Sequence, residues 1–329
     1  PVWKNHMIRS HRIIALVALV LLALVPLVVQ DSYTRHVFII AFIYATVAVN
    51  WDLSLGLGGL FNFGHLAFFG TGVYAAAILS TAGGLSPWLA IVLAGGVAAV
   101  AALLIALLVA RLQGIYVVLV TFAFGQLCMQ LVLSQRQITG GAEGIVRLPY
   151  LMLGDYSFIR DYKFAYYYVA LAMLALSVFL LLLLARSAFG KSLRALRDNP
   201  DYAAARGISV ARQRVLVLVA SAVFTGIAGG FYAIYLRVAS PEVFGFSIGT
   251  LVLSMVLIGG AGSIIGPAFA ALALTFATEA MAGVRGMEEA RFIIVAVAMI
   301  VVLRVAPGGA IDIASRLFQP RRKKEGNSP

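Results

Sequence analysis

The sequence has little charge for its length, and acidic residues are especially scarce. Of its 329 residues, 12% are charged, with 25 Lys and Arg against 13 Asp and Glu, whereas 62% are hydrophobic. The mean hydropathy is +0.99. A soluble domain carries roughly 25% charged residues. This shortage of charge argues against a water-soluble protein and predicts a membrane protein.

Reactive and metal-binding groups are also few. Cys128 is the one cysteine, which excludes a disulfide framework and a cysteine-rich metal site. The letters GKS at 190–192 resemble the end of a phosphate-binding loop, but that motif needs a glycine five residues before Gly190, where this chain has Ala185. We therefore expect no catalytic site, no metal and no ATP hydrolysis by this chain.

Four long stretches have no charged residue: 53–110, 112–135, 215–236 and 243–278. A membrane-spanning helix needs about 20 apolar residues, so these stretches predict transmembrane helices and hairpins. We predict an all-α, polytopic bundle of about ten transmembrane helices. Their expected ranges are 13–29, 37–55, 60–80, 87–110, 115–133, 164–185, 215–236, 247–260, 264–282 and 291–306. The first is longer than the core of a signal peptide, so we expect it to be retained.

The net charge of +12 is concentrated in three clusters, at the N-terminus, within 186–214 and in RRKK at 321–324. Basic residues beside apolar spans mark the cytoplasmic side, so this pattern does not indicate a nucleic-acid partner. Ten crossings place all three clusters on that side. We expect a cytoplasmic segment 1–12, a transmembrane domain 13–310 and a basic cytoplasmic tail 311–329. Within the transmembrane domain we expect an external loop 134–163 and a cytoplasmic segment 186–214.

Two glycine-rich stretches interrupt the apolar pattern, LGLGGLFNFGHLAFFGTG at 55–72 and IGGAGSIIGP at 258–267. Glycine weakens a helix by about 1 kcal/mol relative to alanine. Free backbone groups are tolerated in a membrane only where protein or a water-filled cavity satisfies them. The two stretches predict either broken helices or close helix contacts, in opposite halves of the chain, as in transporters built from inverted repeats.

A polar stretch, 189–209, separates two apolar segments. Asn199 is a good N-cap, Pro200 suits the first helical position, and Gly207 is a typical C-terminal stop. The sequence therefore predicts a helix of about two turns here, after another short helical piece at 193–197. Isolated helices shorter than about 12 residues are unstable in water. The stretch is therefore either a loop on the membrane surface or a docking element for a partner.

Four motifs in order resemble the permeases of branched-chain amino-acid ABC importers, the LivM/LivH family. They are GLFNFGHLAFFGTGVYAAAIL at 59–79, TGGAEGI at 139–145, LRALRDNPDYAAARGIS at 193–209 and IGGAGSIIGPAFAA at 258–271. Their order and the TGGAEGI insertion resemble the LivM type more than the LivH type. One departure is that the alanine run at 203–205 lacks a preceding Glu, which affects the expected docking contacts.

The resemblance implies a non-catalytic permease subunit in the bacterial cytoplasmic (inner) membrane. It implies two ABC ATPase subunits, which would bind ATP and magnesium, a second permease of the LivH type and an extracytoplasmic substrate-binding protein. Residues 192–207 of the polar stretch would then be the coupling segment that seats in a cleft of an ATPase subunit. The residues expected to carry this coupling are Leu193, Arg194, Arg197, Asn199, Asp201, Ala203, Ala204, Ala205, Arg206 and Gly207.

Polar residues inside the spans are candidates for the pathway, because such residues are costly in a membrane. They are Asn50, Asp52, Asn62, His65, Gln126, Gln130 and Glu279, and the glycines expected at structural breaks are Gly64, Gly70, Gly259, Gly260 and Gly262. Each polar residue also has a structural explanation: Asp52 and Glu279 at helix ends, His65 bonded to freed backbone, and the two glutamines as contacts between helices.

Other functions remain open at this stage. A urea or short-chain amide ABC permease has a similar sequence. An ion-coupled secondary transporter would use Asp52, His65 and Glu279 as proton or sodium sites. A membrane-embedded enzyme lacks any catalytic group of residues.

Overall fold

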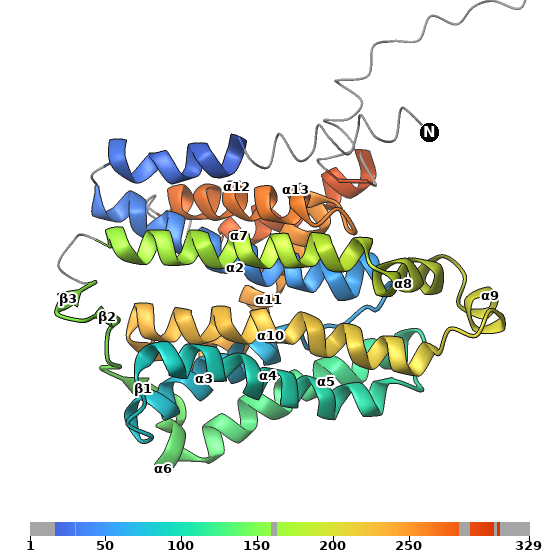
Figure 1. The fold of residues 1–329 in the computed structure, drawn as a ribbon, viewed down its shortest axis with the longest axis horizontal. Helices are drawn as coiled ribbons and strands as arrows, with labels where there is room; N and C mark the ends of the chain where they lie inside the picture. Colours follow the sequence, from blue (N-terminus) through green and yellow to red (C-terminus); the bar gives the residue numbers. More distant parts are fainter. Residues whose placement is uncertain (1–16, 30, 159–162, 283–289, 306–307, 310–329) are drawn as a thin grey trace, which may run out of the picture.

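The computed structural model describes residues 17–29, 31–158, 163–282, 290–305 and 308–309. It is a bundle of helices that run along a common direction, as Figure 1 shows. This confirms the all-α class. The expected terminal segments 1–12 and 311–329 lie outside the described residues.

The apolar helices follow the predicted spans closely. Among the described residues six helices are long enough to cross a membrane, and four shorter apolar helices lie at the other predicted spans. In chain order they are the N-terminal helix Val17–Val28, α2 (Ser32–Asp52) with a π-helical extension Leu53–Leu57, α3 (His65–Thr81), α4 (Pro87–Val109), α5 (Ile115–Ser134), α7 (Phe164–Arg186), α10 (Val210–Leu236), α11 (Phe246–Gly259), α12 (Ile265–Ala282) and α13 (Ala290–Val305).

Both glycine-rich stretches are breaks in the helical backbone. The first comprises the π-helical turn and the non-helical residues 58–64, so α3 begins at His65 and not at 60 as expected. Gly59 lies there at φ +63°, which only glycine adopts readily. The second break is 260–264, between α11 and α12. One of the helices beside each break, α3 and α11 respectively, is short, with 17 and 14 residues.

Helix α2 occupies the centre of the bundle. In its most apolar window 83% of the residues are buried, against 22% in α5. It packs against α12, α7 and α10. Phe38 and Phe42 on α2 meet Tyr167 on α7 edge to face, at centroid distances of 5.7 and 5.1 Å. The first break therefore follows the most buried of the six long helices in the described part of the chain.

Helices α3, α4 and α10 pack against one another unusually closely. A Cβ atom at Gly72 of α3 would overlap the backbone of Gly226 on α10, and one at Gly229 would overlap the backbone of Phe69. Small residues let helices approach closely in membranes, where van der Waals packing replaces the hydrophobic effect. This trio is the most tightly joined part of the bundle.

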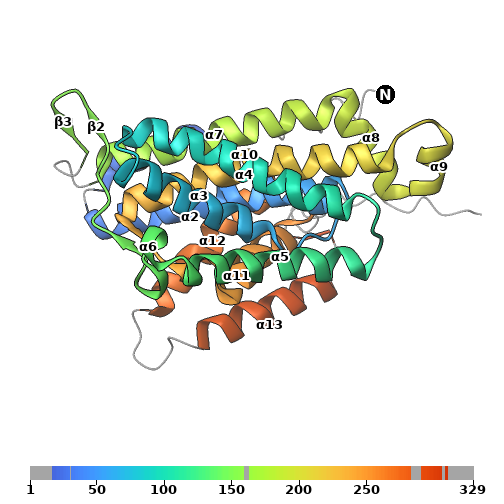
Figure 2. The same ribbon diagram turned by 90° about the horizontal axis from the view of Figure 1, so that it is seen from below.

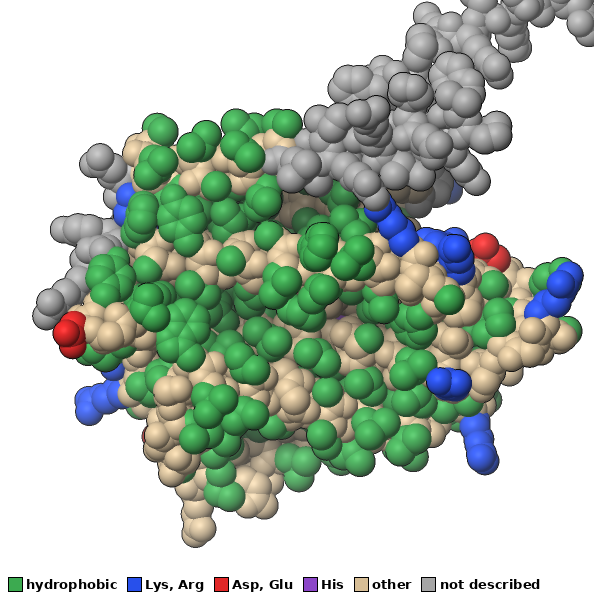
Figure 3. Space-filling view, in the orientation of Figure 1, with side chains coloured by type: hydrophobic (Ala, Val, Ile, Leu, Met, Phe, Trp, Pro, Cys, Tyr) green, Lys and Arg blue, Asp and Glu red, His purple; other side chains and the backbone are tan. Residues whose placement is uncertain are grey.

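The loops separate to opposite ends of the bundle (Figure 2). Loop 134–163 contains α6 (Arg136–Thr139), strand β1 (Ile145–Val146) and the hairpin of β2 (Met152–Leu153) and β3 (Tyr156–Ser157), and β1 pairs antiparallel with β4 (Val238–Ala239) after α10. Helices α8 (Ala188–Asp198) and α9 (Pro200–Ala205) project from the other end. Hydrophobic side chains cover the middle of the face in Figure 3, and Lys and Arg lie toward its ends.

Candidate coupling site

The polar stretch forms two helices. Ser187 caps α8 by accepting a hydrogen bond from the Gly190 amide at 3.4 Å. Along α8 the buried residues are Gly190, Leu193 and Leu196, three residues apart, so one face packs on the bundle. The helix spans eleven residues and is longer than the expected piece at 193–197. Helix α8 is therefore packed against the bundle and fixes the position at which α9 begins.

Helix α9 is the expected short capped helix. The Asn199 side chain accepts a hydrogen bond from the Tyr202 amide at 2.9 Å, and Pro200 occupies the first turn. The helix ends before Gly207, which lies at φ +85°. The Ile208 amide then donates to the Ala203 carbonyl at 3.1 Å, which closes the C-terminus. These contacts define α9 locally, before any partner binds.

One face of α9 points away from the protein. Ala203 faces inward with 1% of its surface exposed, whereas Ala204 and Ala205 are exposed. Beside them, Tyr202 is 58% exposed and accepts a hydrogen bond from Arg206 at 2.6 Å, with the guanidinium over its ring. The outward face thus combines small alanines with an aromatic ring and a cation, a composition suited to a protein partner.

The residues predicted for coupling therefore divide into two groups. Asn199, Asp201, Ala204, Ala205, Arg206 and Gly207 are exposed at the tip, whereas Leu193 and Ala203 are buried. Arg194 and Arg197 contact the protein's own backbone: Arg194 donates to the Ala185 carbonyl at 2.7 Å, and Arg197 donates to the Gly56 carbonyl at 2.8 Å. The second group anchors the tip to the bundle.

Arg197 connects α8 to both glycine-rich breaks. Its Nη1 bonds Gly56 in the first break, while Nε and Nη2 bond the Asp198 carboxylate at 3.1 Å. A Cβ atom at Gly59 would lie 2.7 Å from the Arg197 Cγ, and one at Gly262 would lie 3.1 Å from its Nη1. Glycine at these two positions makes room for the arginine.

Asp52 joins the two breaks directly. This last residue of α2 is 0% exposed. Its Oδ1 accepts a hydrogen bond from the Gly262 amide at 2.6 Å and its Oδ2 accepts one from the Ile264 amide at 2.9 Å. Gly56 lies against the same carboxylate, since a Cβ there would overlap it. We call Asp52, Gly56, Arg197, Gly262 and Ile264 the break clasp.

A second buried cluster lies at the start of α3. The His65 Nε2 is 2.9 Å from the Thr225 hydroxyl on α10, and its ring stacks on Trp51 at a centroid distance of 5.3 Å. Asn62 accepts a hydrogen bond from the Gly64 amide at 2.9 Å. Within the described part of the chain, His65 Nδ1, Asn62 Nδ2 and Trp51 Nε1 have no hydrogen-bond partner although they are buried. The hydrogen-bonding capacity of these three atoms is therefore unused within the described residues.

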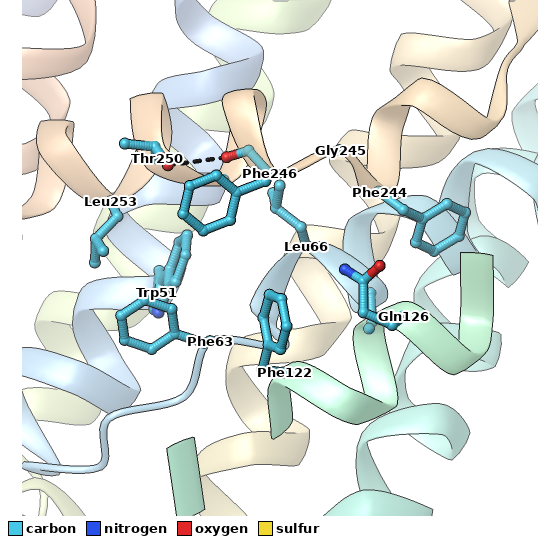
Figure 4. A pocket seen from close by; sticks show the side chains of 13 residues that line it. Trp51, Phe63, Leu66, Phe122, Gln126, Phe244, Gly245, Phe246, Thr250 and Leu253 are labelled. Carbon is cyan, nitrogen blue, oxygen red and sulfur yellow. Dashed lines mark hydrogen bonds between the residues drawn. The ribbon is translucent and has the colours of Figure 1, made fainter. Parts of the chain in front are cut away.

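A small pocket of about 40 Å³ lies beside this cluster, between α3, α5 and α11 (Figure 4). Its walls are mostly apolar and aromatic, with Trp51, Phe122 and Phe246 among them, and Gln126 is the residue of the expected pathway set that lines it. Gly70 lies near the pocket, because a Cβ there would overlap the ring of Phe244, another wall residue. Of the expected pathway residues, Gln126 lies at this pocket, Asn62 and His65 lie in the cluster beside it, and Asp52 and Gly262 belong to the break clasp. Asn50 lies apart from both, and its Nδ2 donates to the Ser177 hydroxyl at 2.7 Å.

Sequence reasoning placed Asp52 at a helix end but missed the partners that it holds 210 residues away. The signal for a buried role was its charge within an apolar span. Thr225 was missed entirely, because a threonine in an apolar helix is unremarkable. Glu279, in contrast, lies near the exposed end of α12, where it accepts a hydrogen bond from Tyr33 at 3.2 Å. Among the described residues no group of three His, Cys, Asp or Glu could hold a metal ion.

Comparison with known proteins extends these observations. A family model described as "Branched-chain amino acid transport system / permease component" matches residues 33–303. The chain is 30% identical over 319 residues to the high-affinity branched-chain amino acid transport system permease protein LivM of Escherichia coli (strain K12), with 91% of this chain and 74% of that protein covered. The LivM protein of Salmonella typhimurium is 30% identical over 292 residues, with 82% and 68% covered. No solved structure matches significantly.

Proposed function

The chain belongs to the family of branched-chain amino acid transport permeases, and we propose that it is one of two permease subunits in a binding-protein-dependent ABC importer. It is a multi-pass membrane protein, and we assign it to the bacterial cytoplasmic (inner) membrane. It forms half of the translocation pathway and has no catalytic role. Two separate ABC ATPase subunits bind ATP and magnesium and supply the energy.

The ATPase subunits dock on the outward face of α9. The observation that carries this assignment is a short helix capped by its own sequence, projecting beyond the bundle with Ala204 and Ala205 exposed. Small side chains let a partner approach the α9 backbone closely. Asn199 and Gly207 hold the helix in shape before docking, which lowers the entropy cost of binding.

Movement of α9 then reaches the pathway through the break clasp. Helix α8 moves together with α9 as a rigid element, because Leu193 and Leu196 are buried and hold its helix in place. Its Arg197 bonds the first break, and Asp52 binds the first break to the second. Nucleotide binding shifts the inward-open and outward-open states only by its differential affinity for them. The break clasp provides the contacts through which this difference in binding free energy acts on both halves of the permease chain.

A second permease subunit, of the LivH type, packs along α5. This helix is the least buried of the six long spans, and it exposes Gln126 and Gln130 one turn apart. Amide side chains are poorly accommodated by lipid tails, so these residues face protein or a water-filled path. The pathway accordingly runs between this α5 and its counterpart, past the apolar pocket that Gln126 lines.

The cargo is a branched-chain amino acid or a similar small amphiphile. An aliphatic side chain matches the apolar walls of the pocket, and few polar atoms would meet its charged groups. An extracytoplasmic binding protein delivers it at the end that carries β1–β4. The ion-coupled alternative is less favoured, since the Asp52 carboxylate already accepts two backbone hydrogen bonds and Glu279 bonds Tyr33 at an exposed helix end.

Co-purification of the permease with its ATPase subunit tests the docking site. Ala204→Arg places a bulky charge on the outward face of α9, and we expect it to abolish co-purification while leaving membrane insertion intact. Ala211→Arg is the matched control, because Ala211 is an exposed alanine at the same end, in the first turn of α10. ATPase binding that survives Ala204→Arg contradicts the docking site. Uptake by the permease alone, driven by an ion gradient, contradicts the ABC assignment.

A further inference from the structure

A long apolar groove lies between the N-terminal helix, α7 and α12. Its volume is about 490 Å³, far larger than that of the pocket beside α5. Each of the three walls contributes a small residue, Ala18, Ala175 and Ala268, and these leave the space between the helices unfilled. Phe179 and Phe269 line it and are 58% and 43% exposed, so the groove is open to its surroundings.

One end of the groove carries a positive charge. Among the residues that line it, Arg186 is the one polar side chain, and it is exposed at the last position of α7. The lining along α7 runs from Leu171 to Arg186, which corresponds to roughly 22 Å of helix at 1.5 Å per residue. One leaflet of a bilayer core is about 15 Å thick. The groove can therefore hold an extended acyl chain whose head group reaches the arginine.

The charged end coincides with the end of the bundle that carries α8 and α9. Three further basic residues, Lys191, Arg194 and Arg197, follow Arg186 in α8, and Arg197 bonds Gly56 and Asp198. Arg194 is committed to the Ala185 carbonyl at 2.7 Å, whereas Lys191 is exposed. By the positive-inside rule this end faces the cytoplasm, where anionic lipid head groups are attracted to basic residues.

We propose that this groove binds an anionic phospholipid of the cytoplasmic leaflet, with an acyl chain along α7 and the phosphate at Arg186. Apolar walls next to a bilayer are covered by lipid tails unless protein covers them, and Arg186 selects a negatively charged head group. A bound lipid fills the space between the N-terminal helix and the rest of the bundle, and so stabilises their contact.

The test measures thermal stability in detergent with added lipid. Dioleoyl phosphatidylglycerol is expected to raise the midpoint of unfolding more than dioleoyl phosphatidylcholine does, and inorganic phosphate alone is expected to have no effect. Arg186→Gln should weaken the phosphatidylglycerol effect by roughly fivefold in apparent affinity, because one basic residue near an anionic surface contributes about 1 kcal/mol. Ala175→Phe, which fills the groove, should abolish it.

Two variants serve as matched controls. Ala172→Phe adds the same bulk on an exposed position of α7 outside the lining, and Arg212→Gln removes an exposed charge at the same end of the bundle. Both should respond to lipid as the unmodified protein does. Equal stabilisation by the two lipids, or a phosphatidylglycerol effect that survives Arg186→Gln and Ala175→Phe, overturns the proposal. Destabilisation by Ala175→Phe with no lipid response in the unmodified protein indicates a protein occupant and overturns it too.

Discussion

Replacing Asp52 with asparagine tests the break clasp most directly. The carboxylate accepts hydrogen bonds from the amides of Gly262 and Ile264 at 2.6 and 2.9 Å. An asparagine side chain of the same size has one accepting oxygen, so its NH₂ group would face one of the two backbone donors. A buried donor without a partner costs about 1–3 kcal/mol. Removal of a buried charge offsets part of this cost, and we expect a net loss of about 2 kcal/mol.

This loss should be visible in two measurements. In a protein of 329 residues about 2 kcal/mol corresponds to a fall of roughly 3 °C in the unfolding midpoint. In the reconstituted importer, the same loss shifts a two-state equilibrium by up to about thirtyfold. We therefore expect Asp52→Asn to retain its ATPase subunits on purification, because α9 is untouched, and to take up much less substrate for each ATP hydrolysed.

Asp198→Asn is the control for this experiment. It makes the same chemical change close by, but Asp198 is exposed and its pair with Arg197 is a surface ion pair, which contributes at most about 1 kcal/mol. Its unfolding midpoint should change little. Equal midpoints for the two variants, or full coupling of ATP hydrolysis to uptake in Asp52→Asn, would refute the role assigned to the clasp.

Three further changes test the packing and the caps by thermal unfolding in detergent. The added methyl of Gly72→Ala overlaps the backbone of α10, so this change should lower the free energy of unfolding by about 1–3 kcal/mol. The control Gly96→Ala meets no atom within 4 Å and should leave the free energy of unfolding unchanged or raise it by up to about 1 kcal/mol. Asn199→Ala removes the N-cap of α9, which should lower the free energy of unfolding by about 0.5–2 kcal/mol and weaken ATPase binding. Asn199→Asp keeps a capping oxygen and should restore ATPase binding. Thr225→Val removes the hydrogen-bond partner of His65 and should cost about 1–3 kcal/mol.

The features that the sequence predicts well are those determined locally. The ten apolar stretches appear as helices because their length and composition alone favour that state. Helix α9 was predicted to within a residue at its start, since Asn199, Pro200 and Gly207 act on their own neighbours. The start of α3 was misplaced by five residues, because hydropathy does not distinguish an apolar loop at 58–64 from the helix after it.

The break clasp could not be predicted in the same way. Its hydrogen bonds join Asp52 to residues more than 200 positions away, and they depend on where α2 and the α11–α12 turn meet in three dimensions. The sequence contained each component separately: a charge in an apolar span, two glycine-rich breaks and a basic polar stretch. Only the fold shows that Arg197 places the polar stretch against both glycine-rich breaks.

The arrangement of rigid and broken segments suggests where the permease moves. Helices α3, α4 and α10 are joined by glycine contacts that admit no side chain, so they act as one body. The two breaks, in contrast, separate α2 from α3 and α11 from α12, and both lie next to Arg197. In the proposed function a displacement of α9 reaches these two breaks, whose non-helical residues 58–64 and 260–264 make few of the helical hydrogen bonds that oppose backbone rotation. Because Asp52 ties one break to the other, the proposed coupling predicts that a displacement of α9 acts on both breaks at once.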